Sequence, residues 1–562
     1  MNTPIHNFVK AYRDLRPVRL HMPGHKGRGP LGCEELDLTE IPGADALYEA
    51  DGIIAESEAN ASALFGCPTF YSTEGSSHCI RAMLALAMQA AKALPARELP
   101  YPSSPASRQT DEIGFDAATG NRTPKTADGG RSRLAPLEMK GRFRVLAARN
   151  VHRAFLTAAA LLDLDVCWLP VTGLSYLSAN PTPAELNAAL SETGAAAVYL
   201  TCPDYLGKLP ALSPLAEVCH AHRALLLVDN AHGAYLRFLT PSRHPIDLGA
   251  DLCCDSAHKT LPVLTGGAYL HLSPAFAETM TAEQDGQQAA ALFTPSSTVK
   301  NALALFGSTS PSYLILQSLD LANSYLETLP ERLAAFLQGV EALKARLRAS
   351  GWRLIEDEPL KLTLDLRPPA ETNVACPTSG SQRSPDFLHA GTGIACPPSG
   401  TDLASMLEQQ GIFCEFADAD FVVFMLSPEN TARNLERLET VLVDIIHQAD
   451  DRERTCNACP YTTQKAPTPP RALALPKASA PCGRDAASPV VQGAMPEVVC
   501  SIREAMLAPA VTIPAAESLG RILARPGVSC PPAVPILMPG ERIDAAARDA
   551  FAHYGIKLIQ VL

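Results

Sequence analysis

The chain has 562 residues, of which 47% are hydrophobic and 19% are charged, and its formal net charge is −12. This length and composition permit about three or four domains with a large buried core, and the dispersed negative charge argues against nucleic acid as a partner. The apolar stretches are too short or too interrupted to cross a bilayer, and residues 1–17 lack the apolar run of a secretory signal. The 16 cysteines are scattered, so we expect reduced thiols in a cytoplasmic protein rather than a disulfide framework.

The first part of the chain alternates irregular and helical stretches. Residues 1–50 form an N-terminal segment whose prolines and glycines force an irregular path. Residues 53–66 and 78–94 are rich in alanine and have helical periodicity, and a small polar turn lies between them. Residues 97–140 carry almost no apolar periodicity and many Pro, Ser, Arg, Asp and Gly, which predicts a mobile insertion.

Alternating strands and helices follow this insertion. Strand candidates lie, in chain order, at 144–148, 195–200, 224–228, 251–254 and 267–272. Helical stretches at 183–191 and 212–222 separate several of them. Such alternation predicts an α/β fold with a doubly wound, mostly parallel sheet, in which ligands bind beyond the carboxyl ends of the strands. We expect this sheet to form a large domain over residues 51–330.

The remainder of the chain predicts smaller α/β domains. A predicted helix at 315–349 leads from the large domain into a small α/β domain at 331–450, which a second insertion at 376–400 interrupts. A low-complexity linker at 451–490 then separates a C-terminal domain, 491–562. Within the small domain the predicted elements are two strands and one helix, at 360–366, 421–426 and 403–409.

Two charged residues come directly after predicted strands. Asp229 ends the apolar run 225–228, where a buried carboxylate is costly unless it is paired. Lys259 follows the strand candidate 251–254. A lysine that forms a Schiff base with an aldehyde, and an aspartate that keeps a pyridine nitrogen protonated, are what a pyridoxal-phosphate (PLP) site requires. We therefore expect PLP as the cofactor; taken alone, each residue also fits a surface lysine or a turn aspartate.

A small polar turn offers a place for the cofactor's phosphate. Gly75, Ser76 and Ser77 lie where this turn enters a helix, and a helix N-terminus favours an anion. Ser256, three residues before the lysine, offers a further hydroxyl. A Gly-Ser turn is common in proteins, so its assignment as a phosphate site depends on the neighbouring lysine and aspartate.

Two histidines are placed to act on the same cofactor. His152 follows the first strand after the insertion and is predicted to stack on the cofactor ring; a partly buried polar residue is the alternative. His258 is predicted to contact either the phosphate or the substrate. Cys456 and Cys459 have the spacing of metal ligands but lack a second Cys or His pair at a usable distance. No metal site is therefore expected.

Several motifs occur in a characteristic order along the chain. They are HMPGHKG at 21–27, TEGSS at 73–77, RNVHR at 149–153, TCPDYLG at 201–207, DNAHG at 229–233, SAHKTLP at 256–262, STSPSY at 308–313 and PILMPGE at 535–541. Together they resemble the Orn/Lys/Arg decarboxylase family of fold-type-I PLP enzymes, in its shorter bacterial form. The resemblance covers residues 1–95, 141–375, 401–450 and 491–562.

The resemblance implies a fold-type-I PLP-dependent transferase-like fold. It also implies a homodimer, or a multiple of dimers, whose sites are shared between subunits. By the same resemblance, Thr201 and His232 contact the cofactor, while Thr309 and Ser310 reach the cofactor of the neighbouring subunit. Glu541, in the C-terminal motif, is the candidate ligand for the distal cation of the substrate.

The chain departs from the family's pattern at several positions. His25 and Lys26, in the N-terminal motif, are assigned to substrate binding, but other motifs are altered. Glu74 stands where the family usually has Asn, and a carboxylate beside a phosphate is unfavourable unless it points away. Asp204 replaces a usual Thr and Asn230 a common Glu, and the segment 529–535 lacks a glycine expected after its paired prolines.

The expected reaction is decarboxylation of arginine, lysine or ornithine to the corresponding polyamine-pathway amine. Lys259, Asp229, His152 and His258 are the predicted catalytic residues, and Lys259 or His258 returns the proton to the α-carbon. An aminotransferase or aldolase would use the same lysine and aspartate. A non-catalytic regulatory paralogue is the alternative outside enzymes. The sequence leaves open which basic amino acid is the substrate.

Overall fold

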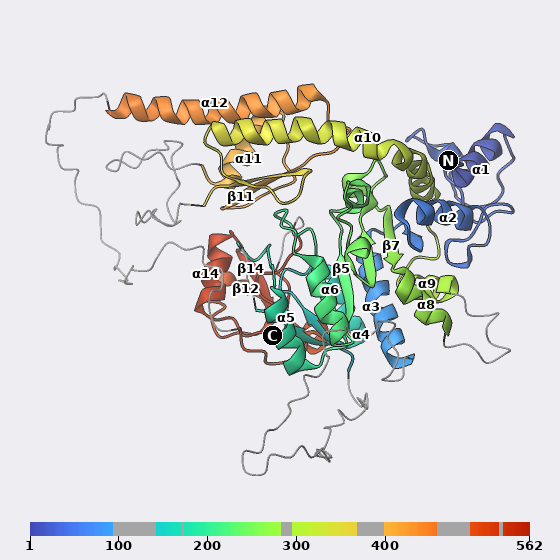
Figure 1. Cartoon of the computed structure of the whole chain (residues 1–562), viewed down its shortest axis with the longest axis horizontal. Coiled ribbons are helices and arrows are strands. Elements are labelled where there is room, and N and C mark those ends of the chain that lie inside the picture. The colour runs from blue at the N-terminus through green and yellow to red at the C-terminus, as the bar shows by residue number, and fades with distance from the viewer. Residues whose placement is uncertain (94–141, 171–173, 283–294, 368–397, 458–494, 528–531) are drawn as a thin grey trace, which may run out of the picture.

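The computed structural model describes residues 1–93, 142–170, 174–282, 295–367, 398–457, 495–527 and 532–562. The insertion predicted at 97–140 lies outside the described residues, as do most of those at 376–400 and 451–490 and part of the segment 529–535. Figure 1 shows a large central sheet with helices around it, a pair of long helices along one side, and a C-terminal unit beside the sheet.

The large domain contains a seven-stranded sheet in the order β1-β7-β6-β5-β4-β2-β3. In chain order the strands are β1 (Thr69–Ser72), β2 (Arg144–Ala147), β3 (Asp165–Trp168), β4 (Ala197–Thr201), β5 (Leu225–Asp229), β6 (Leu252–Asp255) and β7 (Ala268–Leu272). Neighbours from β6 to β3 are parallel, whereas β7 is antiparallel to both β6 and β1. The predicted mostly parallel sheet is confirmed. The sequence did not predict β1 and β3, which are short and lie at the two edges.

Alternate residues of the strands pack against helices on opposite faces of this sheet. Val145 and Ala147 join the apolar cluster of α3 (Ser76–Ala93) and α4 (Arg153–Leu162). Leu146, between them, joins the cluster of α5 (Pro183–Thr193) and α6 (Leu212–Ala221). Because side chains alternate between the faces of a strand, a strand that is buried on both faces needs a continuous apolar run. The chain supplies such runs at β4, β5 and β6.

Three helices from distant parts of the chain pack together beside β1 and β7. They are α1 (Pro4–Asp14), α2 (Ile53–Phe65) and the N-terminal half of α10 (Tyr313–Ala349). The short helices α8 (Pro274–Ala282) and α9 (Pro295–Ala304) follow β7, and α9 packs against α3. The predicted helices at 53–66, 78–94 and 315–349 are confirmed as α2, α3 and α10.

The small domain has a four-stranded antiparallel sheet in the order β10-β11-β9-β8. Its strands are β8 (Leu354–Ile355), β9 (Lys361–Asp365), β10 (Phe416–Ala417) and β11 (Phe421–Met425). Three helices cover it, namely the C-terminal half of α10, α11 (Gly400–Gln409) and α12 (Ala432–Asn457). Figure 1 shows α10 and α12 side by side. Helix α12 continues past residue 451, where the sequence predicted the start of a linker.

The C-terminal unit has a three-stranded antiparallel sheet in the order β12-β14-β13. Its elements are α13 (Ile502–Leu507), β12 (Val511–Pro514), β13 (Leu523–Arg525), α14 (Ala545–His553) and β14 (Leu558–Val561). Helix α13 packs on α4, which fixes the unit against the large domain. Within the described ranges, no helix is both long enough and apolar enough to cross a membrane.

Candidate active site

Asp229 and Lys259 meet at the carboxyl ends of two adjacent strands. β5 ends at Asp229, and β6 runs parallel to it, with Cys254 opposite Asp229. From β6 the chain enters the short helix α7 (Ala257–Thr260), which carries Lys259. Burial raises the pKa of Asp229, and the nearby charge of Lys259 opposes that rise. The two residues therefore lie together at the edge of the sheet where ligands bind in such folds.

The carboxylate of Asp229 is buried and held by donors on both oxygens. The hydroxyl of Tyr199 donates to Oδ2 over 3.1 Å, and the backbone N–H of Ala231 donates to Oδ1 over 3.1 Å. These bonds fix the orientation of the carboxylate and favour its charged form. A buried carboxylate still needs a counter-charge, and a protonated ring nitrogen of a cofactor is a group of that kind.

His232 lies directly against Lys259. Its Nε2 is 2.9 Å from Nζ of Lys259, and its ring packs edge-on against Tyr205 at 5.1 Å between centroids. Burial holds the pKa of His232 well below its usual range, and the charges of Lys259 and Lys361 lower it further. His232 is therefore neutral, and each of its ring nitrogens faces the end of a lysine.

His152 is the N-cap residue of α4. Its Nδ1 accepts a hydrogen bond from the backbone N–H of Ala154 over 3.1 Å. Burial lowers the pKa of His152 to about 4, and the charge of Lys259 contributes to this shift. His152 is therefore a neutral imidazole near Lys259, with one nitrogen committed to the helix. A fixed neutral ring in this position fits the predicted stacking on a cofactor ring.

The polar turn at 73–77 lies beside the segment that carries Lys259. The hydroxyl of Ser256 is 2.7 Å from that of Ser76, the first residue of α3, and the backbone N–H of Gly75 donates to the carbonyl of Gly266 over 2.7 Å. His258 is also fixed here, with Nδ1 2.9 Å from the carbonyl oxygen of Gly267. The predicted phosphate hydroxyls are thus brought together at the N-terminus of a helix of 18 residues.

The described residues fit a PLP molecule. Gly75 has φ +72°, and a Cβ there would meet only the ring of His258, so the turn is both open and restricted to glycine. The amide group of Asn150, which follows β2, is buried and has no hydrogen-bond partner within the described residues. An unpaired buried amide of this kind is what a bound polar ligand satisfies. The acid, the amine, the histidine ring and the hydroxyls that the sequence predicted for the cofactor therefore lie in one region.

The departures from the family's pattern have structural explanations. The exposed Glu74 accepts a hydrogen bond from the backbone N–H of Ser308 over 2.6 Å, so its carboxylate is directed to that segment. Asp204 closes its own turn by accepting from the N–H groups of residues 206 and 208, and burial raises its pKa to about 6. Asn230 donates to Asp255 over 2.7 Å, so it braces the ends of β5 and β6.

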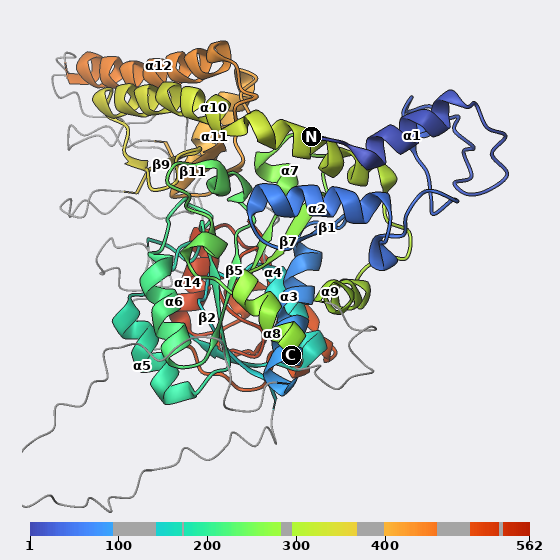
Figure 2. The ribbon, with the colours of Figure 1, turned by 45° about the vertical axis from the view of Figure 1, so that its right-hand side comes forward.

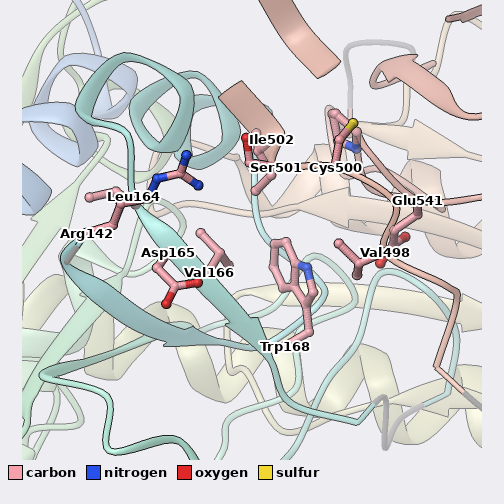
Figure 3. Close-up of a pocket in the computed structure, with 11 residues that line it drawn as sticks. Arg142, Leu164, Asp165, Val166, Trp168, Val498, Cys500, Ser501, Ile502 and Glu541 are labelled. Carbon is pink, nitrogen blue, oxygen red and sulfur yellow. The ribbon is translucent and has the colours of Figure 1, made fainter. Parts of the chain in front are cut away.

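Glu541 is placed differently from the sequence expectation. Its carboxylate forms a buried bidentate pair with Arg149, and its Oε2 also accepts from the backbone N–H of Met538 over 2.8 Å. It lines a cavity between β3 and the C-terminal unit, together with Trp168 and Cys500 (Figure 3). None of the predicted cofactor ligands lines that cavity. Both carboxylate oxygens are engaged within the chain, and the structure does not bring Glu541 to Lys259, so its assignment to the substrate's cation stays a prediction.

His25 and Lys26 lie on the segment after α1, which projects from the body of the molecule (Figure 2). His25 pairs with Asp37 over 3.2 Å, and Lys26 is exposed. Within one chain the structure does not bring either residue to Lys259. Their assignment to substrate binding therefore stays a prediction.

The remaining predicted cofactor ligands lie on the segments that the motifs indicated. The hydroxyl of Thr201, at the end of β4, donates to the carbonyl of Asn150 over 3.3 Å. Ser77 follows Ser76 in the first turn of α3. Thr309 and Ser310 are exposed and follow the residue that contacts Glu74. Their predicted reach to a neighbouring subunit stays a prediction.

Sequence reasoning missed three polar residues at the site. Tyr199 binds Asp229, but in the sequence it is one residue of an apolar strand. Lys361, the first residue of β9, contacts His232 over 3.0 Å. The half-buried Glu415 accepts from the hydroxyl of Tyr205 over 2.9 Å. Of these three residues, only Lys361 gave a signal in the sequence. It is the first residue of an apolar strand, where burying an unpaired charge usually lowers stability.

Comparisons with known proteins relate the chain to PLP-dependent decarboxylases. The sequence model of the Orn/Lys/Arg decarboxylase major domain matches residues 139–357. The uncharacterized protein YaaO of Bacillus subtilis is 25% identical, over 97% of this chain and 92% of that protein. An arginine decarboxylase of Halalkalibacterium halodurans is 23% identical, over 96% of this chain and 91% of the relative.

A solved structure shares the fold. Lysine decarboxylase A from Pseudomonas aeruginosa superimposes with a TM-score of 0.63 at 16% identity, covering 98% of this chain and 76% of that protein. At this identity the likeness shows the fold alone. The family model covers residues 139–357, and the relatives that align over nearly the whole chain include two arginine decarboxylases. The major domain therefore matches the Orn/Lys/Arg decarboxylase family, and the whole chain resembles its PLP-dependent amino-acid decarboxylases.

Proposed function

We propose that the chain decarboxylates a basic amino acid, with arginine as the first substrate to test, and that Lys259, Asp229 and His152 act on the cofactor. The observation that carries the proposal is the convergence of the lysine and the aspartate at the carboxyl ends of β5 and β6, with the Ser76 and Ser256 hydroxyls 2.7 Å apart beside them. Arginine is preferred because several relatives that align with the chain are named arginine decarboxylases.

Each residue has a defined task in the proposed reaction. When bound, PLP supplies an electron-withdrawing ring into which the electron pair of the broken bond to the carboxylate is delocalised. Asp229, oriented by Tyr199, holds the proton on the ring nitrogen. His152 supports one face of the ring. Ser76, Ser256 and the N-terminus of α3 anchor the phosphate, so that the bond to be broken is held in a fixed orientation.

Lys259 and His258 are the two candidates for returning a proton to the α-carbon. Lys259 would hold the cofactor through its side-chain amine, and the same amine would carry the proton. His258 has its Nδ1 on the carbonyl of Gly267, and burial lowers its pKa, so it is a neutral imidazole. Its Nδ1–H donates to that carbonyl, so Nε2 holds the free electron pair and would have to take up a proton before returning one to the α-carbon.

Glu415 is the proposed ligand for the distal cation of the substrate. It lies on the small domain beside β10, half-buried, with Oε1 on the hydroxyl of Tyr205. The negative charge of Glu415 raises the pKa of His258, which opposes the lowering by burial. Glu415 is therefore a carboxylate within electrostatic range of the site, whereas Glu541 is already paired with Arg149.

An absorbance spectrum and a CO2-release assay with L-arginine, L-lysine and L-ornithine test the proposal. We expect a visible cofactor band that is lost in Lys259→Ala, and CO2 from one of the three substrates. A band without CO2 would favour aminotransfer or aldol cleavage, and the absence of a band in excess PLP would favour a regulatory paralogue. Glu415→Gln should raise the KM by about tenfold or more, with a smaller change in kcat. Light scattering tests the proposed homodimer or multiple of dimers.

A further inference from the structure

A second buried lysine reaches the active-site lysine through His232. Lys361, the first residue of β9, is 1% exposed. Its Nζ lies 3.0 Å from Nδ1 of His232, and the other ring nitrogen, Nε2, lies 2.9 Å from Nζ of Lys259. The small domain thereby contacts the site of the large domain through one imidazole.

The contact with His232 is not needed to satisfy the buried ammonium group of Lys361. A buried ammonium group is costly unless it is paired, and Lys361 is paired with the carboxylate of Glu358 over 2.9 Å and also donates to the carbonyl of Asp204 over 3.1 Å. Lys344 is equally buried, but it donates to the carbonyls of Glu358 and Pro359. A lysine can therefore be satisfied in this region without a contact to His232.

The contact with Lys361 selects one tautomer of His232. An ammonium group has donors and no acceptor, so Nδ1 of His232 must accept from Lys361. A neutral imidazole carries a single proton, and that proton then lies on Nε2. The Nε2–H group points at Nζ of Lys259, which can accept it only when that nitrogen has a free electron pair. This arrangement favours the unprotonated form of Lys259.

We propose that Lys361 is a positioning residue that holds His232 in the Nε2–H tautomer, so that His232 donates to Nζ of Lys259 and keeps this amine in its reactive, unprotonated form. The inference rests on the proposed function in one respect, namely that Lys259 is the cofactor lysine. It assigns opposite roles to the two lysines: Lys361, which pairs with Glu358, donates to Nδ1 of His232, and Lys259 accepts from its Nε2–H group.

The other ionisable groups near Lys361, His232 and Lys259 are compatible with the proposed tautomer of His232. His152 and His258 lie close enough to affect His232, and both have lowered pKa values because they are buried. Asp229 faces Lys259 from β5, and Asp204, whose pKa burial raises to about 6, faces Lys361. Burial, together with the positive charge of Lys361, lowers the pKa of His232 itself, so His232 stays neutral whether or not Lys259 is protonated. The aromatic groups packed around these residues are Tyr205 and Tyr235.

Competitive acylation with acetic anhydride tests the proposal on the full-length protein after removal of the cofactor. Mass spectrometry of the Lys259 peptide gives the extent of acylation at each pH, and hence the midpoint at which Lys259 gains its proton. In Lys361→Met both tautomers of His232 become accessible, so Lys259 should protonate more easily. The midpoint should rise by about one pH unit or more, a tenfold change in the protonation constant. Lys361→Arg, which keeps a charged donor, should restore most of the wild-type midpoint.

Two comparisons separate this effect from the loss of a nearby charge or of folding. Lys344→Met removes an equally buried lysine from the same region and should leave the midpoint unchanged. In a His232→Gln background, adding Lys361→Met should shift the midpoint far less than it does in the wild type. An equal shift in both backgrounds, or no shift in the wild type, would overturn the proposal.

If Lys361→Met does not fold, Lys361→Arg and His232→Gln still give the midpoint. No change in His232→Gln would overturn the role of the imidazole. The pH dependence of the visible band in the PLP-loaded protein gives a second readout. A visible band that persists in Lys259→Ala, with the acylation shift preserved in Lys361→Met, would contradict the assignment of Lys259 as the cofactor lysine while leaving the role of Lys361 intact.

Discussion

Arg149 and Glu541 are 392 residues apart in the sequence, yet they form a buried bidentate ion pair. Nη1 and Nη2 of the arginine lie 2.6 and 2.8 Å from the two carboxylate oxygens, and the guanidinium also lies over the ring of Trp168. Arg149 follows β2, three residues before His152. The pair therefore joins the C-terminal unit to the loop that carries His152, the histidine proposed to stack on the cofactor ring.

Glu541→Gln should destabilise the protein strongly, because it leaves the guanidinium of Arg149 buried without a counter-charge. We expect a loss of about 3 kcal/mol or more in the free energy of unfolding, measured by urea denaturation. Glu497→Gln is the matched control, because Glu497 pairs with Arg542 over 2.7 Å but is exposed. An exposed pair contributes little, so this variant should be close to wild type. Equal effects of the two substitutions would contradict the assigned role of Glu541.

Asp229→Asn should lower kcat by about 100-fold or more. The neutral amide cannot stabilise a protonated ring nitrogen, so the cofactor loses its capacity to accept the electron pair of the broken bond. The visible band should persist, because Lys259 is unchanged. Tyr199→Phe removes one hydrogen bond to Asp229 while leaving the carboxylate in place, so its effect on kcat should be much smaller. Steady-state kinetics would check both, and a wild-type kcat in Asp229→Asn would contradict the assigned role.

The central sheet and the core of the site could be predicted from the sequence. Buried parallel strands need apolar runs on both faces, and a polar residue that directly follows such a run must lie at one edge of the sheet. This local rule places Asp229, Lys259 and His152 near one another. The edge strand β3 was missed although residues 166–168 are apolar, because the strand has only four residues and these are only half-buried.

The roles of other residues depend on partners that only the folded chain brings close. Glu541 belongs to a recognisable motif, but the motif does not show that Arg149 occupies its carboxylate. The carboxylate of Glu74 was expected to disturb a phosphate, and its contact with Ser308, 234 residues away, directs it elsewhere. Lys361 lies in the small domain and gives no local sign of its contact with His232. These are long-range contacts, which periodicity and strand-end rules do not address.

Asp255 is the centre of a buried polar network below the site. Its Oδ2 lies 3.2 Å from Nε2 of His244 and 3.1 Å from Nε2 of His271, and its Oδ1 accepts from Asn230. Burial alone would raise the pKa of Asp255, but the two histidines outweigh burial and hold the pKa below its usual range. Because Ser256 follows directly, this network fixes the segment that enters α7.

Asp255→Asn should lower the free energy of unfolding by about 3 kcal/mol or more, since it removes the charge that both histidines face. In the wild type, the contribution of Asp255 to the free energy of unfolding depends on pH. A carboxylate whose folded pKa is lowered stabilises the protein above its unfolded pKa of about 4, and this stability is lost as the pH falls through the folded value. Urea denaturation between about pH 3 and pH 7 should show a steeper loss in the wild type than in Asp255→Asn. Parallel profiles would exclude this role.

The junction between the C-terminal unit and the small domain should be weaker at alkaline pH. Nε2 of His553, at the end of α14, lies 3.0 Å from Oδ1 of Asp420, and this hydrogen bond raises the pKa of His553. Burial raises the pKa of the adjacent Asp418 to about 6. A histidine with a raised folded pKa stabilises the fold fully below its unfolded value of about 6.5 and loses that contribution as the pH rises through the folded value. The raised pKa of Asp418 also makes the junction weaker as the pH rises, because burying this carboxyl group costs least while it is protonated.

Hydrogen exchange of the α14 amides at about pH 5 and about pH 9, corrected for the intrinsic dependence of exchange on pH, would measure this effect. Protection should be greater at the lower pH. In His553→Gln the side chain no longer titrates, so the change in protection between the two pH values should shrink to the part that Asp418 supplies. Protection of the α3 amides, remote from this junction, serves as the internal reference. If α14 were equally protected at both pH values, the contact between His553 and Asp420 would not hold the C-terminal unit in place.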